Sequence, residues 1–225
     1  MMLNELLSES KKDFSPLFQP DLNPENTYFL DFSIHNPEMK LLDFQKIDEL
    51  NSYVFNKIKQ AGMKYGYGGY IEDREVYRRS PLFALSPEEA RSIHLGIDVW
   101  TEAGKPVFAP LDSTVHSFAN NDNYGDYGPT IILKHELKGI SFYTLYGHLD
   151  LESIENLYEG KPIEKGQMFC RVGNYPVNGD WPPHLHFQII SDIGQKKGDF
   201  PGVCSKYDKE KYMKICPDPL VFFSL

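Results

Sequence analysis

The sequence predicts a mainly β protein, an antiparallel β-sandwich or open barrel with an N-terminal α+β extension that contains one long amphipathic helix. Three observations support this. Six short apolar or alternating runs follow one another in the second half of the chain, turn residues separate them, and a sustained helical periodicity occurs only before them. A hydrophobic content of 41% over 225 residues is enough to build a substantial core.

The first part of the chain differs from the rest. Residues 1–26 are polar, contain three prolines and show no sustained periodicity, so we expect an extended arm. A short apolar run over 28–34 predicts a strand. Over 41–60 the apolar side chains recur at intervals of three and four, which predicts an amphipathic helix.

Beyond residue 90 the pattern becomes that of strands joined by turns rich in Gly, Pro, Asn and Asp. The predicted strands cover 93–100, 106–118, 130–136, 140–149, 161–172 and 184–190. We therefore divide the chain into two parts. Residues 1–90 form an N-terminal extension with arm, strand and helix, and residues 91–225 form the β domain.

Composition excludes several classes of protein. The formal net charge is −9 and no local cluster of Lys and Arg offsets it, so we do not expect nucleic acid as a partner. The N-terminus lacks the basic start and apolar run of a secretory signal, and no run reaches the roughly 18 apolar residues of a membrane span. We therefore expect a cytoplasmic protein, with export by another route as the alternative.

The cysteines also agree with a cytoplasmic protein. Cys170, Cys204 and Cys216 form an odd set without metal-ligand spacing, so no disulfide framework is implied. Reduced and partly buried thiols are the favoured interpretation, with one bridge from Cys204 to Cys216 as the alternative.

The run 93–100 places two polar groups on one face of a strand. Successive strand side chains point to opposite faces, so His94, Gly96 and Asp98 share one face. The opposite face is apolar and consists of Leu95, Ile97 and Val99. A nitrogen ligand and an oxygen ligand separated only by a glycine leave space for an ion.

A second run repeats this pattern. In 184–190, His184, His186 and Gln188 share one face, opposite an apolar row. A third run, 140–149, contains His148 close to its end. If the three strands are neighbours, their polar faces converge.

Imidazole and carboxylate groups suit zinc, and a catalytic zinc site has three protein ligands and one open position. The runs supply five candidate groups, which are His94, Asp98, His148, His184 and His186. The surplus suggests groups that move protons or stabilise an oxyanion. Spacing alone does not decide which histidine of the 184/186 pair is the ligand. The remaining histidines lack such partners and are expected to be structural: His35, His116 and His135.

At these residues the sequence resembles a known family, the lysostaphin-type (LytM-like) zinc metalloendopeptidases, which cut peptides of the bacterial cell wall. The resemblance covers roughly 91–222 and implies the duplicated hybrid motif fold of that family. The matching motifs are HLGID at 94–98, APLDSTV at 109–115, YTLYGHL at 143–149, IEKGQ at 163–167, PHLHF at 183–187 and PDPL at 217–220.

Carried over residue by residue, the resemblance implies that His94, Asp98 and His186 bind Zn²⁺, while His148 and His184 are catalytic. It further implies a zinc metallopeptidase that hydrolyses an amide bond in a peptide or peptidoglycan fragment by means of a zinc-activated water.

Some features depart from the family. Ser113 replaces a usual glycine, and Trp181 stands beside the second motif in place of a glycine-rich run, so we expect a reshaped cleft. Two alternatives remain open: a catalytically silent regulatory or binding module of the same fold, and an intracellular amide hydrolase with a non-wall substrate. The charged stretch 70–79 is interpreted as a solvated face rather than a lining of the cleft, and it supplies no predicted site residue.

Overall fold

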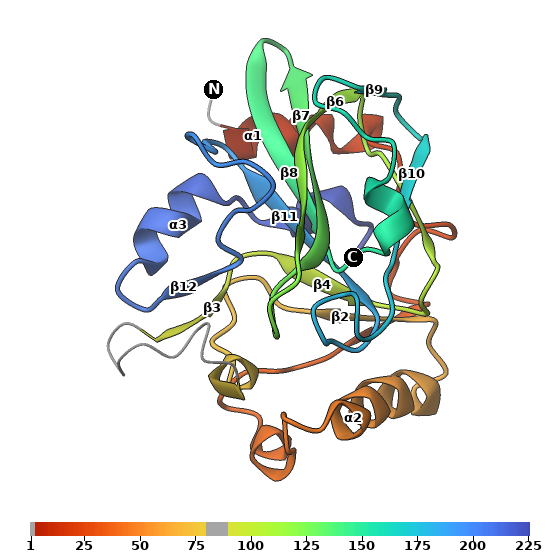
Figure 1. Cartoon of the computed structure of the whole chain (residues 1–225), viewed down its shortest axis with the longest axis vertical. Coiled ribbons are helices and arrows are strands. Elements are labelled where there is room, and N and C mark those ends of the chain that lie inside the picture. Colours follow the sequence, from red (N-terminus) through yellow and green to blue (C-terminus); the bar gives the residue numbers. More distant parts are fainter. Residues whose placement is uncertain (1–2, 80–89) are drawn as a thin grey trace.

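The computed structural model describes residues 3–79 and 90–225, and these residues confirm the mainly β class (Figure 1). A large sheet runs through the molecule in the order β1-β2-β4-β11-β8-β7-β6-β9. Its strands are β1 (Thr27–Phe29), β2 (Tyr65–Gly68), β4 (Ile97–Trp100), β6 (Ser113–Asn121), β7 (Gly128–Leu137), β8 (Ile140–Gly147), β9 (Pro162–Ile163) and β11 (His184–Ile190).

Two small ribbons and several helices complete the described structure. The ribbons pair β5 (Pro106–Phe108) with β10 (Met168–Arg171) and β3 (Arg91–His94) with β12 (Val203–Ser205). The α-helices are α1 (Leu3–Ser10), α2 (Ile47–Gln60) and α3 (Lys209–Ile215). Short 3₁₀-helices cover Lys11–Asp13, Pro37–Leu41, Val76–Arg79, Leu151–Ile154 and Pro219–Phe222.

The large sheet is mixed rather than purely antiparallel, because β1 runs parallel to β2 while the other pairs are antiparallel. It does not close into a barrel within the described residues, since β1 and β9 are its two edges. β2, which precedes residue 90, pairs with β4 of the predicted β domain. The division of the chain at residue 90 stays a prediction.

One face of the sheet forms the main core. Apolar side chains of β4, β7, β8 and β11 pack there against the β5–β10 ribbon. Alternation along β11 puts Leu185, Phe187 and Ile189 into this core, as predicted. The side chains of His184, His186 and Gln188 therefore belong to the other face, on which the candidate site lies.

Three predicted strands are each interrupted. The run 106–118 divides into β5 and β6, and 161–172 divides into β9 and β10. Gly166, with φ of 79°, lies in the turn between the last two strands. The run 93–100 is also wrong as a single strand, because β3 pairs with β12 outside the large sheet, and β4 pairs with β11 inside it.

The N-terminal predictions need three corrections. Residues 1–26 are not an extended arm, because α1 forms within them and buries Leu7, and Leu17 and Phe18 join the main core. The strand predicted over 28–34 is shorter: β1 ends at Phe29, and the Asp31 carboxylate then accepts a hydrogen bond from Ser33 N.

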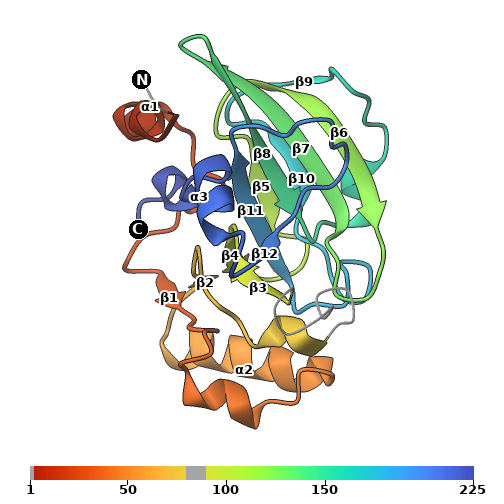
Figure 2. The ribbon, with the colours of Figure 1, turned by 90° about the vertical axis from the view of Figure 1, so that its left-hand side faces the viewer.

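The amphipathic helix is confirmed, but it begins at Ile47 instead of Leu41. Asp43 accepts a hydrogen bond from Gln45 N, which favours a turn before the helix. The buried face is formed by Leu50, Val54 and Ile58, four residues apart. Figure 2 shows α2 beside β1 and β2, at the end of the molecule opposite the β6–β7–β8 strands.

Two further observations concern the described residues as a whole. Cys170, Cys204 and Cys216 are all free and buried, which confirms the favoured interpretation of reduced thiols. Within residues 3–79 and 90–225, no helix is both long enough and apolar enough to cross a membrane.

His135 is a buried histidine away from the candidate site. Its Nε2 lies 2.7 Å from Thr144 Oγ1, and its ring stacks on Phe142. Burial lowers the pKa of His135 to about 4. Because the unfolded chain takes up this proton near pH 6.5, the stabilising contribution is present above pH 6.5 and is lost as the pH falls toward 4.

We therefore predict that His135→Gln flattens the loss of stability in acid. Between pH 6.5 and 4 the variant should lose about 2–3 kcal/mol less free energy of unfolding than the wild type. Urea denaturation at several pH values measures this difference, with the exposed His35→Gln as the control. Parallel curves for wild type and His135→Gln would contradict the prediction.

Candidate metal centre

Three adjacent strands bring the predicted site residues together. β11 lies between β4 and β8, so the convergence expected for neighbouring strands is confirmed. His186 pairs directly with Asp98 on β4 and with Gly147 on β8. His148 follows β8 immediately, and His184 lies two residues before His186, so all of these side chains reach one region.

The structure gives Gly96 a different role from the predicted one of leaving space for an ion. A Cβ at this position would lie 2.7 Å from Cε1 and Nε2 of His186 and 2.7 Å from the Phe187 carbonyl oxygen. The missing side chain therefore makes room for the His186 imidazole rather than for an ion. His94 reaches the same centre from β3, although it does not share a strand with Asp98.

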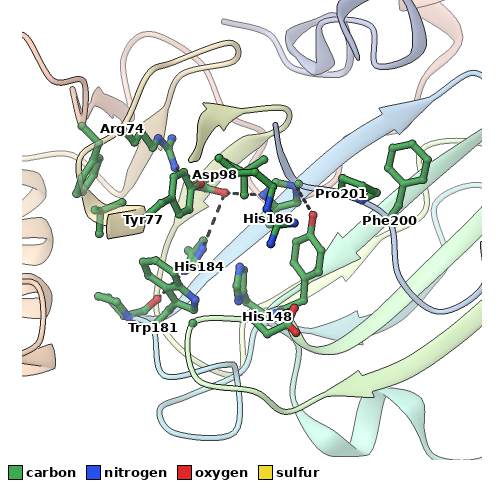
Figure 3. Close-up of a pocket in the computed structure, with 18 of the residues that line it drawn as sticks. Arg74, Tyr77, Asp98, His148, Trp181, His184, His186, Phe200 and Pro201 are labelled. Atoms are coloured by element: carbon green, nitrogen blue, oxygen red, sulfur yellow. Dashed lines mark hydrogen bonds and ion pairs between the residues drawn. The ribbon is translucent and has the colours of Figure 1, made fainter. Parts of the chain in front are cut away.

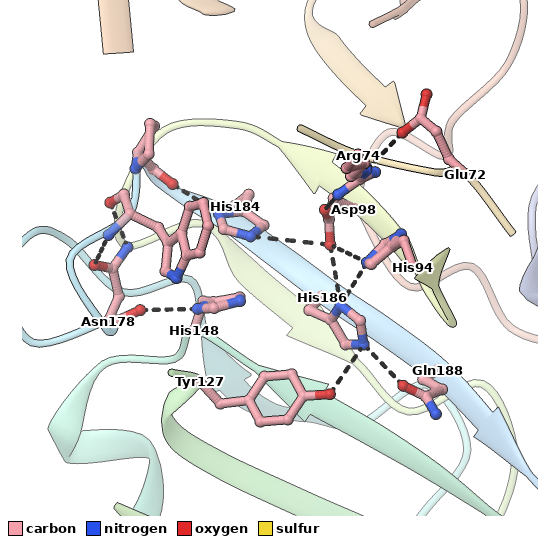
Figure 4. Close-up of polar contacts among 12 residues, drawn as sticks. Glu72, Arg74, His94, Asp98, Tyr127, His148, Asn178, His184, His186 and Gln188 are labelled. Atoms are coloured by element: carbon pink, nitrogen blue, oxygen red, sulfur yellow. Dashed lines mark hydrogen bonds and ion pairs between the residues drawn. The ribbon is translucent and has the colours of Figure 1, made fainter. Parts of the chain in front are cut away.

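Three ligand atoms meet in this buried centre (Figure 4). Asp98 Oδ1 lies 3.3 Å from His94 Nε2 and 3.1 Å from His186 Nδ1, and the two imidazole nitrogens are 3.0 Å apart. Ligand atoms about 2.0–2.1 Å from a tetrahedral zinc ion are separated from each other by about 3.3 Å. The spacing of these donor atoms therefore fits one small tetrahedral cation.

Hydrogen bonds behind the ligands decide which nitrogen of each ring faces the centre. His94 Nδ1 lies 3.0 Å from the Gly69 carbonyl oxygen, which only accepts, so Nδ1 has the proton and Nε2 the lone pair. His186 Nε2 lies 3.0 Å from Gln188 Oε1, and Gln188 Nε2 donates to the Pro201 carbonyl oxygen. His186 therefore turns its Nδ1 lone pair inward. Two lone pairs and a carboxylate oxygen in contact favour a bound cation.

The other two histidines lie side by side at the edge of the centre. β8 ends at Gly147, and His148 takes φ of 61°, a left-handed conformation that marks a constrained turn. Its ring centroid is 4.1 Å from that of His184. The Nδ1 atoms of His148 and His184 donate to the carbonyl oxygens of Asn178 at 2.8 Å and Pro182 at 2.7 Å. Each ring thus has its lone pair on Nε2.

Burial keeps these rings neutral. It lowers the pKa of His184 to about 4 and that of His94 to about 4. It also lowers the pKa of His148 well below its usual range, and the neighbouring His184 adds to the effect. At neutral pH, His148 and His184 therefore each present an unprotonated Nε2.

Arg74 contacts the centre from the N-terminal extension, and the sequence did not identify it. Its Nη1 donates to Asp98 Oδ2, and its Nε donates to Glu72 Oε2 (Figure 4). Arg74 is only 2% exposed, so the prediction of a solvated charged face over 70–79 is wrong at this position. Burial opposes ionisation of Asp98, but contacts with His94 and Arg74 outweigh it and keep the pKa of Asp98 well below its usual range.

A cavity of about 220 Å³ opens beside His148, His184 and His186 (Figure 3). Trp181 forms part of its wall, as its position beside the second motif suggested. The N-terminal extension supplies another part of the wall, which consists of Phe32, Leu50, Arg74, Val76 and Tyr77. The cavity is therefore bounded by both parts of the chain.

Comparison with known families finds a match for part of this chain. Residues 92–198 match the family described as peptidase family M23. The match confirms the resemblance to lysostaphin-type peptidases that the motifs indicated, and it supports a peptidase role for this part of the chain. A search of curated proteins found no match.

Solved structures show similar segments. A zinc-containing peptidase from Vibrio cholerae is 27% identical over 48% of this chain and 30% of its own, with a TM-score of 0.36. The catalytic domain of lysostaphin from Staphylococcus simulans is 23% identical over 53% of this chain and 80% of its own, with a TM-score of 0.38. A peptidase M23 protein from Pseudomonas aeruginosa is 21% identical over 62% of this chain and 50% of its own, also with a TM-score of 0.38. At these TM-scores the assignment rests on the family match alone.

Gln188 is a second residue without a predicted role, although it continues the alternating polar face of β11. Because its Oε1 orients His186, we predict that Gln188→Met weakens zinc binding about 10- to 100-fold. Competition with a chromophoric chelator measures the affinity, and the exposed Gln45→Met provides the control. An unchanged affinity would show that His186 needs no such partner.

Proposed function

We propose that this chain is a zinc-dependent metalloendopeptidase that hydrolyses an amide bond in a peptide, with peptidoglycan-related peptides as the first substrate class. The observation that supports the proposal is the close approach of His94 Nε2, Asp98 Oδ1 and His186 Nδ1 next to two neutral histidines. The match to peptidase family M23 agrees with it.

Each residue has a definite task in this proposal. Zinc bound by His94, Asp98 and His186 would act as a Lewis acid, which lowers the pKa of a water toward about 7 and polarises a carbonyl. His148 and His184 present Nε2 lone pairs, so one ring can accept the proton of the attacking water. The resulting imidazolium then donates to the leaving amine or stabilises the oxyanion.

The first test separates metal binding from proton transfer. His148→Ala should keep one equivalent of zinc, because His148 is not among the ligands, but it should lose about 10²- to 10⁴-fold in turnover. His94→Ala should lose both the zinc and the activity. Metal analysis and peptide hydrolysis measure the two properties, and His116→Ala on β6 is the matched histidine control. Full activity in His148→Ala would remove this residue from the mechanism.

The cavity favours a second candidate substrate. Its volume of about 220 Å³ is below the roughly 300–1,000 Å³ of common ligand pockets. The N-terminal extension forms part of its wall, where the Tyr77 ring meets the Trp181 ring edge-on. This small volume favours a small peptide or a modified amine over a long cross-linked polymer.

The two substrate classes can be distinguished directly. We would incubate the zinc-loaded protein with intact cell-wall sacculi, soluble wall fragments and a set of short peptides and acylated amines, and identify the products by mass spectrometry. Cleavage of sacculi or fragments supports the first class, and cleavage of short amides alone supports the second. Zinc binding without any cleavage would contradict the enzymatic proposal and favour a silent regulatory module.

A further inference from the structure

Arg74 lies between two buried carboxylates. Its Nε donates to Glu72 and its Nη1 to Asp98, and Nη1 also lies 3.3 Å from the Tyr77 hydroxyl. The side chains of Arg74, Glu72 and Asp98 are 3%, 7% and 5% exposed. Buried charges of this kind are stable only when they are paired, so the three groups depend on one another.

The guanidinium lies in a closely fitting aromatic slot. Its Cζ is 5.7 Å from the ring centroid of Phe32 and 5.9 Å from that of Trp100. Gly68 pairs with Asp98 across β2 and β4, and a Cβ on Gly68 would lie 2.9 Å from Nη2 and 2.7 Å from the Trp100 ring. The glycine therefore leaves the space that Arg74 needs to reach Asp98.

The segment that bears Arg74 is also attached to the backbone of His94. Ile71 N donates to the His94 carbonyl oxygen, and His94 N donates to the Glu72 carbonyl oxygen, at 2.8 and 2.9 Å. The Gly69 carbonyl oxygen accepts from the His94 ring. These contacts fix the segment that bears Arg74 relative to His94.

The two oxygens of Asp98 consequently have different partners. Oδ1 faces His94 and His186, whereas Oδ2 is bonded to Arg74. We propose that Arg74 is a positioning residue of the metal site that restricts Asp98 to one ligand oxygen and shares the carboxylate charge with the metal ion. The inference rests on the proposed metal site but does not depend on which substrate is hydrolysed.

A shared carboxylate has a definite energetic consequence. Two cations that interact with the same anion repel each other, so Arg74 and zinc each weaken the binding of the other. Arg74 also keeps Asp98 paired when no metal is bound. Because the carboxylate neutralises less of the ion's charge, a bound ion stays a stronger Lewis acid.

The test compares the affinity and the geometry of the metal site in the full chain. Arg74→Met should bind zinc at least about 10-fold more tightly than the wild type, because the competing cation is gone. Its melting temperature should fall without zinc and should rise more on zinc addition than that of the wild type. With cobalt(II) in place of zinc, the visible absorption should weaken, because a freed Oδ2 raises the coordination number.

A second variant changes the same network in the opposite direction. Glu72→Gln keeps an oxygen that accepts the hydrogen bond from Phe32 N, but it removes the negative charge of Glu72. Asp98 is then the one carboxylate that pairs with Arg74 in this network, so Arg74 competes more strongly with zinc for it. Zinc binding should then weaken by about 10-fold. This variant also tests the proposal if Arg74→Met fails to fold. Arg171→Met, which removes a side chain that donates to the Gly104 carbonyl oxygen, is the control for a changed net charge.

The outcomes separate this inference from the proposed function. Tighter binding in Arg74→Met and weaker binding in Glu72→Gln support it. An unchanged or weaker affinity in Arg74→Met, with the cobalt spectrum of the wild type, overturns it and leaves Arg74 with a structural ion pair. If the wild type binds neither zinc nor cobalt, the proposed metal site itself fails, and this inference fails with it.

Discussion

The ionised carboxylate of Asp98 is the constraint to which the rest of the site responds. A buried charge is costly unless a cation compensates it, and Arg74 of the N-terminal extension supplies one. His186 from β11 and His94 from β3 face the same carboxylate with their ring nitrogens. The arrangement joins both parts of the chain around one group, so the extension is a component of the centre.

In each histidine of the site, one ring nitrogen contacts a hydrogen-bond acceptor of the protein. Main-chain carbonyl oxygens orient His94, His148 and His184, and the side chain of Gln188 orients His186. An acceptor on one ring nitrogen leaves the lone pair on the other, so tautomer and direction are decided together. The three candidate ligand atoms therefore face one another.

Much of the site was predictable because alternation along a strand is a local property. In β11 the apolar and polar faces follow the sequence directly, and the histidines lie on the polar face. The same reasoning failed over 93–100, where β3 and β4 belong to different sheets. His94 and Asp98 still meet, but because of how the two strands pack. The helix α1 was missed because eight residues show too little periodicity to distinguish a helix from an arm.

The sequence by itself determined the chemistry of the centre, since the residue types, their alternation and the motif order do not depend on distant contacts. Only the tertiary structure decided what surrounds that centre. Arg74 reaches Asp98 because β2 pairs with β4, and Gly96 admits the His186 ring because the strands pack closely. Such contacts join residues far apart in the chain, and no local pattern encodes them.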